Sequence, residues 1–147
     1  MAEQAGRTPE VAFHFGVPDR LHYALRFLRK ALSRDARVVV TGPAAVLDEL
    51  DRLLWIQDPQ SFLPHLRARD AAAVPVRMAA TPLQLLDQVW PHPDPAMLLN
   101  LHDSIAEGAG HYTRVVEIVS QALPEREAAR RRWREYEGLR WSIVRHD

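Results

Sequence analysis

The stretch EREAARRRWREY, residues 125–136, gathers arginines around one tryptophan. A helix advances 100° per residue, so one face of this stretch combines guanidinium groups with an indole. The side chains on that face are Arg126, Arg130, Trp133 and Arg134. Buried arginines need partners, and a merely solvating face is less aromatic, so we interpret this face as a binding surface. It suits an acidic peptide that carries an aromatic residue, or a phosphate backbone.

Arg130 is the central cation of this face, because it lies one helical turn from Arg126 and from Arg134. A bidentate guanidinium holds a carboxylate well, and we expect Arg130 to make the central carboxylate contact. The outer arginines would attract acidic residues and raise the rate of encounter, an effect that weakens with salt. The alternative is a solvated helix on which the arginines pair with the glutamates at 127, 135 and 137.

A second informative stretch is LDRLLWIQDPQSFLPH, residues 50–65. Trp55 stands at the end of an amphipathic helical pattern, and an apolar tip of Phe62, Leu63 and Pro64 follows in a proline-bounded loop. Large rings in or beside a loop are typical of an interface. The alternative is that Trp55 covers the core and Phe62 packs underneath it. Composition alone does not distinguish an interface from a core position for these rings.

The composition narrows the class of protein. The chain has 147 residues, of which 47% are apolar and 26% charged, which predicts one domain over 1–147 with a flexible tail at 1–10. The net charge is zero, so the overall field does not favour direct binding to nucleic acid. Cysteine is absent, which excludes disulfides and thiol catalysis. No apolar run is long enough to span a bilayer, so we expect a cytoplasmic protein.

Strand and helix patterns alternate along the chain. Strands are predicted at 11–15, 37–40, 74–78, 97–101, 113–119 and 141–144. Helices are predicted after Asp19, after the turn at Gly42 and from Pro124 onward. This alternation predicts an α/β fold: a single three-layer domain with a mainly parallel central sheet and helices on both faces.

Catalytic and metal-binding patterns are missing. The Gly42 turn stands between a strand and a helix, but neither GxGxxG nor GxxxxGK is present, so we interpret it as a structural turn. The residues of HDS at 102–104 have the types of a hydrolase triad, yet sequence neighbours rarely point at one another. The histidines lack metal-ligand spacing. We expect no catalytic residue, metal or cofactor; the alternative is a small nucleotide-binding or hydrolytic enzyme that uses the Gly42 turn.

The order of these segments resembles a known family. LLW followed after five residues by SFLPH, and later VVEIV followed by AARRRWREY with its AxxRWxxY pattern, are similar to the chi subunit of the bacterial DNA polymerase III holoenzyme. The resemblance covers nearly the whole chain, with divergence at 81–95 and in the first ten residues.

The resemblance implies a non-catalytic accessory subunit of the clamp-loader complex. Such a subunit binds the psi subunit and holds the acidic, phenylalanine-terminated tail of single-stranded DNA-binding protein, and so meets nucleic acid only indirectly. The residues that match the tail pocket of the family are Trp55, Val119, Arg126, Arg130, Trp133 and Arg134. The psi contact matches Phe62, with Leu63 and Pro64 beside it. Glu137 replaces a basic residue of some relatives, and Trp55 and Trp133 are expected to wall one slot.

Overall fold

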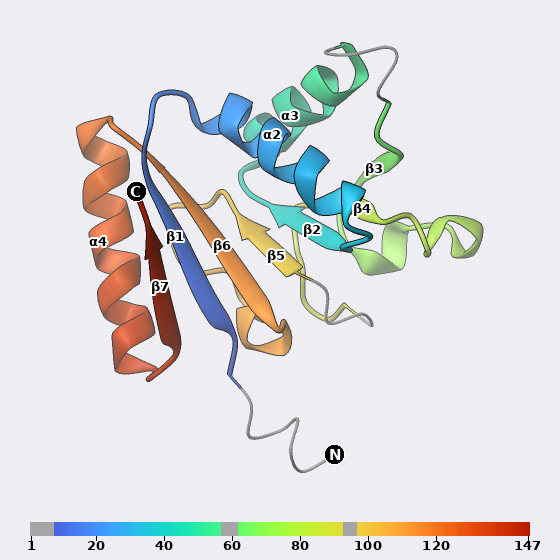
Figure 1. The fold of residues 1–147 in the computed structure, drawn as a ribbon. Helices are drawn as coiled ribbons and strands as arrows, with labels where there is room; N and C mark the ends of the chain where they lie inside the picture. Colours follow the sequence, from blue (N-terminus) through green and yellow to red (C-terminus); the bar gives the residue numbers. More distant parts are fainter. Residues whose placement is uncertain (1–7, 57–61, 93–96) are drawn as a thin grey trace.

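A computed structural model describes residues 8–56, 62–92 and 97–147 of this chain, and a single sheet of seven strands forms its centre (Figure 1). The strands lie in the order β3-β4-β2-β5-β6-β1-β7, and every neighbouring pair is parallel. Their bounds are β1 Glu10–Val17, β2 Val38–Thr41, β3 His65–Ala68, β4 Leu83–Leu86, β5 Met97–Asn100, β6 Arg114–Ser120 and β7 Ser142–His146.

Helices cover both faces of the sheet. Helix α2 (Arg20–Ser33) and helix α3 (Ala44–Ile56) pack on one face, and helix α4 (Leu123–Gly138) packs on the other. Figure 1 shows α4 beside β6, β1 and β7, and α3 at the end of the sheet that β4 and β3 form. The predicted three-layer α/β domain with a parallel sheet is confirmed.

The central strands are apolar on both sides because helices cover both faces. In β2, Val38 and Val40 belong to the core under α2 and α3, whereas Val39 belongs to the core under α4. Strand residues alternate between the two faces, so consecutive valines serve different cores. A continuous apolar run is therefore the expected pattern for such a strand.

The helices begin where the sequence predicts. Asp19 caps α2 by accepting a hydrogen bond from the His22 backbone nitrogen at 3.0 Å, and Pro124 stands in the first turn of α4. Within the described residues, no helix is long and apolar enough to cross a membrane.

The region between α3 and β5 departs from the prediction. Residues 76–78, predicted as part of a strand at 74–78, form a 3-10 turn in which Val76 is 94% exposed. The strands of this region are instead β3 and β4, each of four residues, which were not predicted. The prolines at 64 and 82 stand directly before them and suggested loops. At the other end, Pro9 is buried and β1 begins at Glu10, inside the predicted tail, of which residues 1–7 lie outside the described ranges.

Candidate peptide-binding site

Helix α4 divides its arginines between the core and the solvent. Its buried face, which packs toward β6 and β7, consists of Ala128, Ala129, Arg132 and Tyr136. Arg126, Arg130 and Arg134 are exposed on the other side, and Trp133 is half-buried at the boundary. The helical periodicity alone predicts this separation for the three exposed arginines.

A buried polar network holds α4 against the sheet. Glu117 on β6 is fully buried, and its carboxylate accepts hydrogen bonds from Arg132 Nε at 2.9 Å and from the Tyr136 hydroxyl at 2.6 Å. Asn100 on β5 donates to the same carboxylate at 3.0 Å. Burial raises the pKa of Glu117, and the positive charge of Arg132 opposes that rise. With its donors satisfied, this network fixes how α4 presents its outer face.

The outer face of α4 borders a cleft with a volume of about 620 Å³, which we call the arginine cleft. Its lining includes the predicted residues Arg126, Arg130, Trp133 and Arg134. The opposite wall comes from the ends of β1, β6 and β7, and includes Phe15, Ser120, Arg145 and Asp147. The arginines and the ring that share a helical face therefore do line one concave site.

The arginines of the cleft are not neutralised by their own helix. In the described part of the chain, no ion pair joins Arg126, Arg130 or Arg134 to an acid, so the alternative of a self-paired helix does not apply. Glu137 also lines the cleft and is its acidic residue on α4. The cleft therefore keeps an excess of unpaired positive charge on α4, which suits an anionic ligand.

The apolar part of the cleft rests on aromatic stacking. The Trp133 ring lies 5.0 Å from the Phe13 ring and 6.1 Å from the Phe15 ring. Val119 is buried in the same core cluster and is not part of the cleft lining, so it can support Trp133 but not contact a ligand directly. Rings held by their neighbours in this way are suitable walls for another aromatic side chain.

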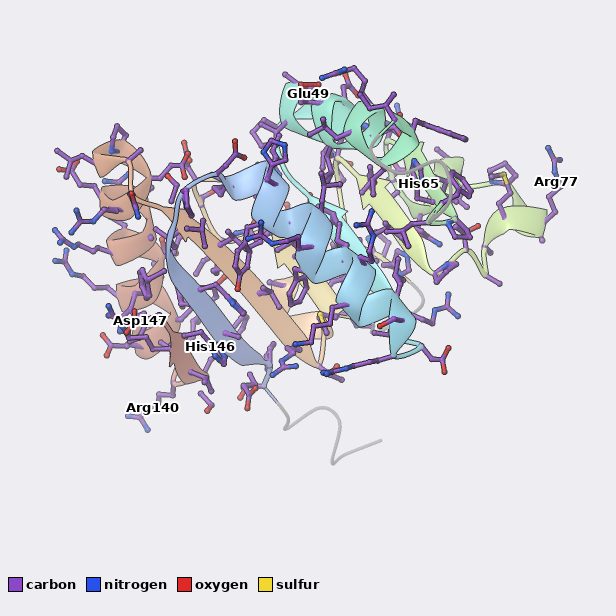
Figure 2. All side chains as sticks on the ribbon, turned by 45° about the horizontal axis from the view of Figure 1, so that its top comes forward. Glu49, His65, Arg77, Arg140, His146 and Asp147 are labelled. Atoms are coloured by element: carbon purple, nitrogen blue, oxygen red, sulfur yellow. The ribbon has the colours of Figure 1, made fainter. Side chains whose placement is uncertain are left out.

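The prediction that Trp55 and Trp133 wall one slot is wrong. Trp55 ends α3, beside β3, whereas Trp133 lies on α4, on the other face and at the other end of the sheet. In Figure 2, His65, which contacts Trp55, and Asp147, which lines the arginine cleft, lie far apart on opposite sides of the molecule. Helical periodicity cannot show which face of the sheet a helix covers, and the prediction failed at that step.

Trp55 belongs instead to a second surface, which we call the aromatic surface: Trp55, Ile56 and Phe62. Trp55 is 58%, Ile56 56% and Phe62 47% exposed. The Trp55 and Phe62 rings lie 5.1 Å apart, and both contact the buried ring of His65, at 5.0 and 5.7 Å. Exposed apolar residues that gather in this way mark an interaction site. The two stretches predicted to bind are therefore both exposed, but they form separate surfaces.

His65 connects the two segments that carry the aromatic surface. Its Nδ1 donates to the Leu63 carbonyl at 2.6 Å. Its Nε2 makes no directed hydrogen bond but lies 3.1 Å from Asp51 Oδ1 on α3. The predicted loop residues Leu63 and Pro64 adjoin this histidine, while residues 57–61, which include Pro59 and Ser61, lie outside the described part of the chain.

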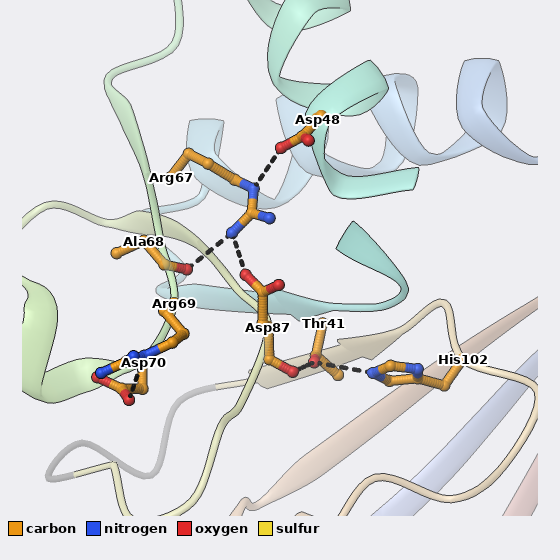
Figure 3. A network of polar contacts seen from close by, with 8 residues as sticks. All are labelled: Thr41, Asp48, Arg67, Ala68, Arg69, Asp70, Asp87 and His102. Atoms are coloured by element: carbon orange, nitrogen blue, oxygen red, sulfur yellow. Dashed lines mark hydrogen bonds and ion pairs between the residues drawn. The ribbon is translucent and has the colours of Figure 1, made fainter. Parts of the chain in front are cut away.

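An arginine on β3, Arg67, connects α3 to the strands that this helix covers (Figure 3). Arg67 on β3 donates through Nε to Asp48 on α3 at 3.0 Å, and its Nη1 pairs with Asp87, which follows β4. One guanidinium thus bridges two carboxylates from separate segments. These polar contacts hold the first half of α3, two turns before Trp55, on the sheet in addition to the apolar face of the helix.

The Gly42 turn is explained by packing. A Cβ atom at Gly42 would lie 2.9 Å from the Leu101 Cβ, too close for any larger residue without movement. His102 lies 3.4 Å from the Thr41 hydroxyl, and among the described residues it has no hydrogen bond to Asp103 or Ser104. The Gly42 turn therefore has a packing role.

Sequence reasoning missed the wall of the cleft that the chain ends supply. Arg145 lies over the Phe15 ring at 4.4 Å and pairs with Asp147 at 3.0 Å. These residues meet because β7 pairs with β1 in parallel register, with Arg145 opposite Phe13. The only signal in the sequence was that Arg145 follows the strand predicted at 141–144. Its position beside Phe15 can be inferred only when the pairing of that strand with β1 is known.

Comparison with known proteins gives consistent matches. The model of the family described as DNA polymerase III chi subunit, HolC, matches residues 9–143. A Pseudomonas aeruginosa protein named DNA polymerase III subunit chi is 29% identical over 128 residues, which are 86% of this chain and 85% of that protein. The family match runs from β1 through helix α4 into the first residues of β7.

Proposed function

This chain belongs to the DNA polymerase III chi subunit family, and we propose that, as such a subunit, it binds the acidic tail of single-stranded DNA-binding protein in the arginine cleft of α4. The family makes it an accessory subunit of the bacterial replicative polymerase. We further propose that it is non-catalytic and takes part in the clamp-loader complex, where the psi subunit binds its aromatic surface.

The unpaired arginines around a half-buried indole carry the tail-binding proposal. A peptide that ends in a carboxylate next to an aromatic ring meets both features of the cleft at once: Arg130 for the carboxylate and Trp133 for the ring. Arg126 and Arg134 flank Arg130 by one turn each and suit the acidic residues that precede the terminus. Trp55, at the far end of the sheet, has no part in this contact.

A calorimetric titration with a synthetic acidic tail peptide tests the proposal, and α4 provides a matched control. Arg130→Ala should weaken binding by about 2 kcal/mol or more, because the carboxylate loses its central partner. Arg131→Ala removes an exposed arginine next to it that does not line the cleft, and should leave the affinity nearly unchanged. Equal affinities for the two variants would contradict tail binding at this site.

The psi contact is the second part of the proposal, and Phe62 is its expected anchor. Phe62 projects an exposed ring next to that of Trp55, on a segment held by His65. Exposed rings clustered on a surface are the usual anchors of a protein interface. Phe62→Ala should abolish co-purification with psi while the tail titration stays unchanged; loss of both activities would indicate a folding defect instead.

A further inference from the structure

A second cleft opens between α2 and the segment that carries Phe62. Its volume is about 430 Å³, and its lining includes Phe62, Leu63 and Pro64 on one side and Arg29, Leu32 and Ala36 on the other. The cleft therefore continues the aromatic surface onto α2. A polypeptide that covers Phe62 is positioned to reach this helix as well.

Arg29 is the unusual residue of this cleft. Its Nε atom is buried, and it has no hydrogen-bond partner. A buried donor without an acceptor costs free energy that most native side chains avoid. In the described residues no ion pair reaches Arg29 either, and Asp35, which also lines the cleft, does not pair with it. The free protein thus holds one buried guanidinium N–H, at Nε, for which it supplies no acceptor.

The surroundings of Arg29 are basic. Arg26, Lys30 and Arg34 lie on or directly after the same helix, and within the described part of the chain none of them forms an ion pair with an acid. Arg26 lies over the Tyr23 ring at 5.6 Å and is not part of the cleft. Charge complementarity therefore favours an acidic partner segment along α2.

We propose that this cleft is an acidic-residue subsite of the psi-binding surface, in which a carboxylate of the bound polypeptide pairs with Arg29 beside Leu63 while an apolar side chain packs on Phe62. This inference depends on the proposed function, since it specifies the partner chemistry of the same surface. The carboxylate supplies the acceptor that Arg29 Nε lacks, on a side chain that is partly buried. It makes this surface selective for partners that combine an acid with an apolar anchor.

The test compares Arg29→Met with Arg26→Met in titrations with the purified psi subunit of the same organism. Methionine keeps much of the apolar stem and removes the guanidinium. Arg29→Met should weaken psi binding by about thirtyfold or more, because the partner carboxylate loses its charged partner. Arg26→Met should change it by less than about threefold, as for an exposed charge. Thermal unfolding of the free Arg29→Met variant should show an unchanged or raised Tm.

The outcomes separate this inference from the proposed function. If psi binds the wild type and Phe62→Ala abolishes binding, but Arg29→Met behaves like Arg26→Met, the subsite is overturned and the psi surface stands. A markedly lowered Tm for Arg29→Met would also overturn the subsite, because it would give Arg29 a structural role. If psi does not bind the wild type, the psi part of the proposed function is refuted, and the subsite with it.

Discussion

The arginine cleft and the aromatic surface represent two different ways of building a binding surface from one sheet. The cleft combines guanidinium groups on a long helix with residues from three strand ends, and a buried network fixes that helix. The aromatic surface combines the end of α3 with a short segment before β3, joined by His65. We expect the first surface to select by charge and the second mainly by apolar contact. Because the two surfaces lie on opposite faces of the sheet, we expect that one bound partner does not block the other.

The largest expected effect comes from removing Glu117, the buried acid that holds α4 and with it the arginine cleft. Glu117→Ala leaves Arg132 buried without its carboxylate and should lower the free energy of unfolding by about 3–5 kcal/mol. Chemical denaturation measures the loss. Glu117→Gln, which keeps the shape and part of the hydrogen bonding, should lose less. Equal stability of the alanine variant and the wild type would show that the network does not hold α4.

Replacing each of two tryptophans by alanine, one in each surface, sharpens the comparison. Trp133→Ala should cost about 2 kcal/mol or more of tail-peptide affinity and leave psi binding intact, since hot-spot rings act locally. Trp55→Ala should do the reverse, because its ring contacts Phe62 and not the cleft. Titrations of both variants with both ligands provide the measurement. A loss of tail affinity in Trp55→Ala would contradict the separation of the two surfaces.

Acidic pH should lower the free energy of unfolding through His14 on β1, at the end of the sheet that bears the arginine cleft. Burial, then His146 and Arg114, lower the pKa of His14 from 6.5 to about 4. As pH falls below 6.5 the unfolded chain binds this proton first, so stability is lost between pH 6.5 and 4 and retained above. We expect a loss on the order of 1–2 kcal/mol, since the ring is partly exposed. Denaturation of His14→Gln across this range should show a flatter profile; an identical profile would exclude His14 as the cause.

The smallest effect concerns the rim of the cleft. Glu137→Lys replaces an acid of the lining by a cation and should raise tail-peptide affinity by about 0.5–1 kcal/mol, mostly at low salt. Glu135→Lys makes the same change at an exposed position outside the cleft lining. The difference in tail-peptide affinity between the two variants separates the effect of position from the effect of net charge. No difference at low salt would show that Glu137 does not oppose an acidic ligand.

Local sequence patterns were sufficient to predict the fold class and the wall of the arginine cleft that α4 supplies. The long apolar or periodic segments, such as 113–119 and the helix from Pro124, were predicted because period and capping act over a few neighbours. The strands β3 and β4 were missed because four residues next to a proline carry too weak a local signal. The grouping of Arg126, Arg130, Trp133 and Arg134 was predicted because they share a helix.

Composition and periodicity established a parallel α/β domain and an exposed cationic face with a ring, since helix and strand geometry follow from local spacing. They could not assign Trp55 to its surface, because that depends on which face of the sheet each helix covers. They also could not bring Arg145 to Phe15 or leave Arg29 without an acceptor. Those relations arise from strand order and packing between segments far apart in the chain, and they appear only when the whole sheet is assembled.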